Sequence, residues 1–242
     1  MKTMILWAIS ILFLTCSPQP VDKGIRPWPE NPRYWQYKGE PVLLLGASDN
    51  DNLFQSEDMI TQLDSLAAAG GNVIRNTMSS RDSGDLWPFY QRADGLYDLD
   101  RWNDVYWTRF AELLNAAEAR DIIVQIEVWD RFDYSRDSWL KNPFHPENNI
   151  NYNANKSGLA AEYPEHPYKD LQPFFHSIPG MPRYVTELDR VRQIQERRVA
   201  KMLSISLQHG NVLYCMNNET NTRPSGVKPG SALFRKKRTR RQ

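Results

Sequence analysis

The chain alternates short apolar runs with amphipathic helical patterns, and this order restricts the folds that are open to it. The four runs, each predicted to be a strand, lie at residues 42–46, 72–77, 122–128 and 212–216, and the second is apolar only at its start. Such short runs, rich in Val, Ile and Leu, are typical of strands buried on both faces of a sheet. Three segments between them carry apolar residues at helical spacing, at 56–69, 102–117 and 186–208. Strands and helices in this alternation predict an α/β fold in which helices cover a parallel sheet.

Two folds begin with this order, the doubly wound sheet and the (β/α)8 TIM barrel. Residues 46–51 follow the first run without the Gly-x-Gly-x-x-Gly spacing that cradles a pyrophosphate. Polar or aromatic residues end the second run, at 75–76, and follow the other three, at 49–52, 129–131 and 217–219. Because such ends converge on one face of a barrel, we favour the N-terminal half of a TIM barrel over residues 41–222. This half would hold about four βα units, and the doubly wound sheet is the alternative.

The segment after the fourth run carries the residues best suited to chemistry. Asn217, Asn218 and Glu219 are poor core material, because a buried carboxylate must find partners. A carboxyl group held there can protonate a leaving oxygen when burial raises its pKa, and a neighbouring amide can bond a sugar hydroxyl. The alternative is that Glu219 caps a loop.

Three stretches of the chain resemble a known family. The run at 212–214 leading into Asn218-Glu219 resembles the fourth-strand signature of retaining glycoside hydrolases of the family 5, cellulase-like type. Residues 72–75, in the second run, are similar to the second strand of the same clan of barrel glycosidases, which often ends in Arg, here Arg75. Residues 34–46 are similar to the opening strand of these proteins, and the resemblance covers residues 30–222.

This resemblance implies that Glu219 is the general acid/base, that Asn218 contacts the sugar hydroxyl next to the scissile bond, and that Arg75 orients the nucleophile. Retention needs a second carboxylate about 5–5.5 Å from the first, which the family carries at strand seven. Asp49, Glu127 and Asp130 match no nucleophile position. We therefore expect an incomplete barrel without turnover of its own, and the alternative is a non-catalytic, carbohydrate-binding fragment.

Other residues at the strand ends are candidates for contact with a carbohydrate substrate. Trp129 follows the third run, and an aromatic ring packs well against the CH face of a sugar. Asp130 and Asp49 are predicted to bind sugar or to solvate their loops. Trp87, in the loop after the second run, is a weaker candidate for stacking.

Several reactive or aromatic residues are better explained by packing. Trp102 and Trp107 fall in the second helical segment, and Cys215 sits within an apolar run, where a small buried hydrophobe is expected. Three histidines occur in the long irregular stretch at 130–183, without close ligand spacing: His145, His166 and His176. We predict neither a metal site nor a cofactor.

The N-terminus predicts export. Lys2 precedes an apolar run at 4–14, which is shorter than the roughly 20 residues of a membrane-spanning helix. Residues 1–16 are predicted to be a signal peptide, with a lipoprotein signal acylated at Cys16 as the second option. The protein would then be secreted or held in the cell envelope, with membrane attachment through a lipidated Cys16. Residues 17–40 are Pro-rich and predict a linker.

The C-terminal segment 223–242 holds eight Lys or Arg residues and no acid, whereas acidic residues outnumber basic ones elsewhere. The chain outside this segment therefore lacks the excess of basic residues that nucleic-acid binding requires, and we expect no nucleic-acid partner. We expect the segment to be a disordered basic tail or the product of a shifted reading frame.

Overall fold

A computed structural model of the chain describes residues 24–163, 173–181 and 183–218. The strands in chain order are β1 (Arg26–Pro27), β2 (Trp35–Tyr37), β3 (Glu40–Val42), β4 (Val73–Thr77), β5 (Phe89–Gln91), β6 (Tyr97–Trp102), β7 (Ile123–Glu127) and β8 (Val212–Cys215). The helices are η1 (Leu53–Gln55), α1 (Met59–Ala68), α2 (Asp104–Glu118), η2 (Arg131–Tyr134), α3 (Arg136–Lys141), α4 (Ala154–Ser157), α5 (Pro173–His176) and α6 (Leu188–Ser206).

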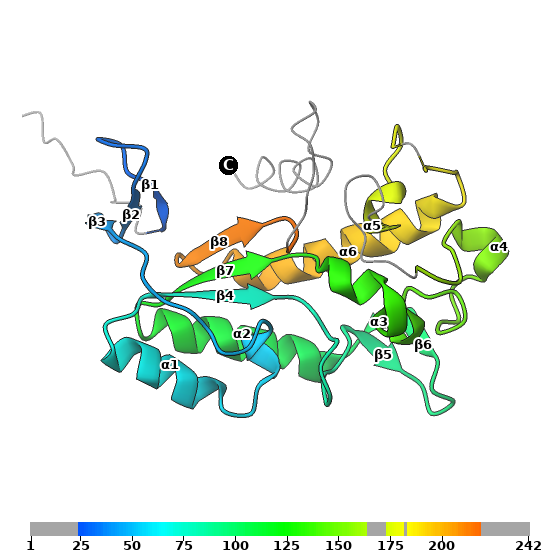
Figure 1. Cartoon of the computed structure of the whole chain (residues 1–242), viewed down its shortest axis with the longest axis horizontal. Coiled ribbons are helices and arrows are strands. Elements are labelled where there is room, and N and C mark those ends of the chain that lie inside the picture. The colour runs from blue at the N-terminus through cyan, green and yellow to red at the C-terminus, as the bar shows by residue number, and fades with distance from the viewer. Residues whose placement is uncertain (1–23, 164–172, 182, 219–242) are drawn as a thin grey trace, which may run out of the picture.

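The central sheet is parallel and has the strand order β4-β7-β8 (Figure 1). In its register Arg75 pairs with Gln125, and Gln125 pairs with Leu213. The three strands come from the second, third and fourth apolar runs. The predicted α/β fold with a parallel sheet is thereby confirmed.

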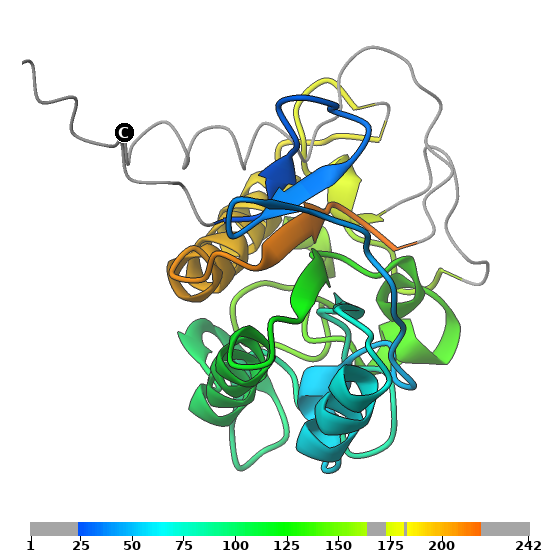
Figure 2. The ribbon, with the colours of Figure 1, turned by 90° about the vertical axis from the view of Figure 1, so that its left-hand side faces the viewer.

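The helices α1, α2 and α6 form where the sequence has apolar residues at helical spacing, and they run alongside the strands (Figures 1 and 2). Helix α2 supplies much of the core, because its aromatic face is buried. The Tyr106 ring meets Phe54 of η1 edge-on, with 5.0 Å between the ring centroids. Trp107 is 3% exposed and packs edge-on against the partly buried Trp102, so both tryptophans belong to the core as predicted.

The first apolar run does not form the buried strand that its composition predicts. Only Val42 belongs to a strand, β3, and Leu43 and Leu45 are 64% and 56% exposed. The segment instead runs beside β4 through Asn72, whose side-chain amide accepts from Leu45 N at 2.8 Å and donates to Leu43 O at 2.9 Å. A side chain therefore takes the place of part of the backbone ladder, which explains why a regular strand is missing here.

Two antiparallel units were not expected from the sequence. Residues 26–42, most of which belong to the predicted linker at 17–40, form the small sheet β1-β2-β3. Next to this sheet, the Ile25 N–H donates to Gly210 O at 2.7 Å. Residues 17–23 lie outside the described part of the chain. The second unit is the hairpin β5-β6, which precedes α2 and includes Trp102, so the helix begins at Asp104.

The stretch at 130–183, predicted to be irregular, contains the short helices η2, α3, α4 and α5 within its described residues. Cys215 is half-buried, so it is less enclosed than a core hydrophobe. Within the described ranges, no helix combines the length and the apolar character needed to cross a membrane.

We predict that Gly46→Ala destabilises the chain. A Cβ atom at Gly46 would overlap with the carbonyl oxygen of Val73, which is a backbone atom of β4. The segment and β4 would have to separate, at a cost of about 1–3 kcal/mol in the free energy of unfolding. Urea denaturation measures this cost, with Ala47→Ser at the exposed neighbouring position as the control. Equal stability of the two variants would contradict the packing of this segment against β4.

Candidate functional site

Polar side chains converge where the three parallel strands end. Thr77 is the last residue of β4 and pairs with Glu127, the last residue of β7. Past the ends of β7 and β8, Asp130 and Asn218 form a further parallel bridge, and the Asn218 N–H donates to Trp129 O at 2.9 Å. The carboxyl ends of the strands therefore place residues from three distant parts of the chain at one edge of the sheet.

Asn218 follows β8 at this edge and is 3% exposed. Its side-chain oxygen accepts from the Arg75 guanidinium, with 3.4 Å between Nη1 and Oδ1. Its side chain also makes a hydrogen bond to Asp130, which lowers the pKa of that carboxyl against the larger, raising effect of burial. The structure thus brings together three of the residues singled out in the sequence, Arg75, Asp130 and Asn218.

Asp51 and Arg81 belong to the same cluster, although the sequence analysis missed both. The Asp51 carboxylate forms ion pairs with Arg75 and with Arg81, the latter at 2.7 Å. Arg81 also forms an ion pair with Asp130, whose side chain is fully buried. The polar stretch 49–52 was the available signal for Asp51, but spacing alone does not tell which acid turns inward.

Asp49, the acid chosen from that stretch, is exposed and lies outside these contacts. The backbone explains the difference. The Thr77 N–H donates to Asp51 O at 2.6 Å, which fixes Asp51 against the end of β4. A role for Asp49 in sugar binding stays a prediction.

Glu127, the last residue of β7, carries a buried carboxyl next to Arg75 of this cluster and is 4% exposed. It accepts a hydrogen bond from Thr77 Oγ1 at 2.9 Å, and Arg75 Nε lies 3.9 Å from its Oε2. Burial raises the pKa of Glu127, while the Thr77 hydroxyl and the Arg75 charge oppose this shift. The carboxyl is therefore easier to protonate than an exposed glutamate.

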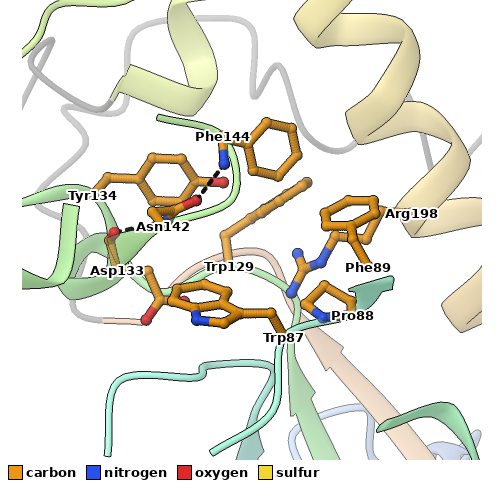
Figure 3. A pocket seen from close by; sticks show the side chains of 9 residues that line it. All are labelled: Trp87, Pro88, Phe89, Trp129, Asp133, Tyr134, Asn142, Phe144 and Arg198. Atoms are coloured by element: carbon orange, nitrogen blue, oxygen red, sulfur yellow. Dashed lines mark hydrogen bonds between the residues drawn. The ribbon is translucent and has the colours of Figure 1, made fainter. Parts of the chain in front are cut away.

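Trp129 forms a wall of a small hollow beside the cluster (Figure 3). The hollow is lined by Trp87, Pro88, Phe89, Trp129, Asp133, Tyr134, Asn142, Phe144 and Arg198. Trp129 is 4% exposed, and the Arg198 guanidinium lies 4.5 Å from the centre of its ring. Arg198 thus covers part of Trp129, so stacking of this ring on a sugar stays a prediction.

Arg198 is itself buried, and it joins α6 to the strand ends. Its Nη1 donates to Val128 O at 3.0 Å and its Nη2 to Met78 O at 2.7 Å. These carbonyls lie directly after β7 and β4, so one guanidinium holds the exits of both strands against the helix.

Asp133 is a buried acid in the wall of the same hollow. Its carboxyl accepts from Ser79 Oγ at 2.9 Å. Burial raises the pKa of Asp133 to about 8, and the nearby charge of Asp130 adds to the effect. Asp133 therefore keeps its proton to a higher pH than an exposed aspartate does.

Glu219, Cys16 and His166 lie outside the described residues. Of the other histidines, His145 bonds Ala161 O through Nε2 at 2.9 Å, and His176 is buried. Across the described ranges, no group of three His, Cys, Asp or Glu side chains is placed to hold a metal ion.

The sequence matches no protein-family model, and no curated protein is similar enough to match it. Among solved structures, the chain is similar to a family 5 glycoside hydrolase mannosidase from Rhizomucor miehei in complex with mannosyl-fructose. The TM-score is 0.56 at 12% identity, over 89% of this chain and 53% of that chain. Another structure of a family 5 mannosidase from the same organism gives 0.50 at 14% identity, over 82% and 49%.

The chain spans about half the length of these mannosidase structures. At such low identity the likeness concerns the fold, and it supports the family 5 type of α/β fold expected from the sequence.

We predict that the stability of the chain falls between about pH 5 and pH 8 because of Asp133. An aspartate in an unfolded chain has a pKa of about 3.9, so over this range the folded chain holds a proton that the unfolded chain has released. The stability that this proton contributes is lost as the pH rises through the folded pKa of about 8. Urea denaturation at both pH values measures the loss. Asp133→Asn keeps an acceptor for Ser79 and should lose less stability between pH 5 and pH 8 than the unchanged chain. An identical loss in the two proteins would show that Asp133 is not its source.

We predict that Arg198→Met destabilises the chain by about 2 kcal/mol or more, because two buried carbonyls lose a charged donor. The methionine keeps much of the buried volume, so the loss reports mainly on the hydrogen bonds. Gln193→Met, at an exposed position of the same helix, is the control and should change stability by less than about 0.5 kcal/mol. Thermal and urea unfolding of both variants measure the difference, and similar values for the two would refute the anchoring role of Arg198.

Proposed function

We propose that the chain takes part in the hydrolysis of O-glycosidic bonds in an oligo- or polysaccharide, by a retaining mechanism in which Glu219 is the general acid/base. The observation that carries this proposal is the setting of Asn218. Its buried amide lies between Arg75 and Asp130 at the carboxyl end of the sheet, and Glu219 is the next residue along the chain.

The chemistry would run in two steps. A second carboxylate, which none of the matched residues of this chain supplies, attacks the anomeric carbon, and the bond to the leaving oxygen breaks as Glu219 gives that oxygen its proton. Water then attacks the same carbon, Glu219 takes a proton from the water, and the carboxylate leaves. Asn218 would bond the sugar hydroxyl beside the scissile bond, and Arg75 would hold the attacking carboxylate.

The substrate class to test first is the mannosides, because the mannosidase of similar fold was solved with mannosyl-fructose. We further propose that the protein acts outside the cytoplasm, as a secreted or envelope protein. The support is the N-terminal sequence alone, with its apolar run at 4–14 and Cys16.

A second candidate function is carbohydrate binding without bond cleavage. The carboxyl groups around Arg75 in the described part of the chain already have partners. Asp51 pairs with two arginines, Asp130 pairs with Arg81, and Glu127 accepts from Thr77. A carboxylate engaged in this way is a weaker nucleophile, which favours a binding role for this cluster.

We predict that the full chain binds a manno-oligosaccharide and that Asn218→Ala weakens this binding about tenfold, because loss of one good hydrogen bond costs about 1.4 kcal/mol. Asn153→Ala, at an exposed position before α4, is the control and should bind normally. Titration calorimetry measures binding, and thermal unfolding checks that both variants are folded.

Turnover of an aryl mannoside by the same samples separates the two candidates. Hydrolysis that Glu219→Gln abolishes would support the glycosidase and contradict the expectation that the chain lacks turnover of its own. Binding without turnover is the result expected of an incomplete barrel, and it would favour the second candidate for this chain alone. Absence of binding to any oligosaccharide would contradict both.

A further inference from the structure

We propose that Asp51 and Arg81 are positioning residues that fix the orientation of the Asn218 amide. This inference rests on the proposed function in one respect, which is that the amide meets the substrate. Neither residue belongs to the sequence signature that links the chain to the glycosidases, and both reach the site from loops.

The contacts form a closed ring of five side chains. Arg75 donates to Asn218, the Asn218 amide bonds Asp130, and Asp130 pairs with Arg81. Arg81 pairs in turn with Asp51, and Asp51 pairs with Arg75, which closes the ring. Each link joins a donor to an acceptor, so the ring has no repulsive contact along its length.

Asn218 is the member whose orientation the ring decides. An asparagine side chain has an oxygen that accepts and a nitrogen that donates, on two arms of similar shape. Here the oxygen faces a guanidinium and the nitrogen faces a carboxylate. A flipped amide would point N–H groups at Arg75 and oxygen at Asp130, and both contacts would be lost. The charges on either side therefore select a single orientation.

Arg81 and Asp51 hold those charges in place. The side chain of Asp130 is fully buried, so its charge requires a partner, and Arg81 supplies it from the loop after β4. The Arg81 fork reaches Asp51 with its second nitrogen and lies 5.0 Å from the centre of the Phe132 ring. A planar fork can bridge two carboxylates at once, which the point charge of a lysine does poorly.

Asp51 couples the two arginines. Its two oxygens each take one guanidinium, Oδ1 from Arg75 and Oδ2 from Arg81. Its backbone oxygen is fixed by the N–H of Thr77, at the end of β4. Loss of the Asp51 charge would remove the link between the two arginines and open the ring, while Arg81 keeps its ion pair with Asp130.

The test is the nuclear magnetic resonance of the Asn218 side-chain amide in the full chain, assigned by its loss in Asn218→Ala. We expect Asp51→Asn and Arg81→Lys to shift both amide proton signals toward those of an exposed asparagine. The same variants should weaken manno-oligosaccharide binding about tenfold. Asp94→Asn, at an exposed acid in the turn between β5 and β6, is the matched control and should change neither quantity.

The outcomes separate this inference from the proposed function. Unchanged Asn218 signals in folded Asp51→Asn would overturn the positioning role, even if Asn218→Ala weakens sugar binding. Shifted signals in a chain that binds no sugar would uphold the ring and overturn the proposed function. If Arg81→Lys does not fold, Asp51→Asn decides alone, because Asp51 is partly exposed and leaves the Arg81–Asp130 pair in place.

Discussion

The fully buried carboxylate of Asp130 is the group on which the arrangement of the site depends. A carboxylate without water is stable only if charges and N–H groups surround it. Its partners come from three places: Arg81 after β4, the Phe132 N–H after β7, and Asn218 after β8. Neutralising one charge therefore cross-links the exits of all three parallel strands, and the polar edge of the sheet becomes a rigid unit.

A second set of buried polar groups lies beside this edge. Arg198 of α6 donates to the carbonyls of Met78 and Val128, so the helix is held where β4 and β7 end. The Trp129 ring lies between this guanidinium and the aromatic side chains around it (Figure 3). Electrostatic interactions are stronger among such buried side chains than in water. The raised pKa values of Glu127 and Asp133 have the same physical origin, the cost of charging a buried carboxyl.

The likeness to family 5 mannosidase structures concerns the course of the backbone. Many unrelated activities share barrel-like α/β folds, so a fold alone does not decide the chemistry. The site adds chemistry to the fold, because Asn218 and Arg75 meet at the carboxyl ends of strands, where barrel enzymes place their reacting groups. The ring through Asp51 and Arg81 lies around this pair, and it is a feature of this chain's own loops.

Local pattern was enough to predict the parallel strands, the three long helices and the edge at which the polar residues gather. Strand and helix periods are properties of neighbouring residues, and the carboxyl ends of parallel strands must share an edge, so Arg75, Asp130 and Asn218 could be named in advance. The first apolar run was expected to form a buried strand and does not. The side-chain amide of Asn72, a residue distant in sequence, takes the place of part of the backbone hydrogen-bond ladder, and Leu43 and Leu45 are exposed.

The inward position of Asp51, next to the exposed Asp49, could not be predicted for the same kind of reason. Which of two acids turns inward is decided by a hydrogen bond from Thr77 and by the two arginines that the folded chain brings to it. The sequence by itself determined the three parallel strands, the three long helices and the edge of the site. The pairing of buried charges was decided only in the tertiary structure, because each carboxylate there is stabilised by groups from distant parts of the chain.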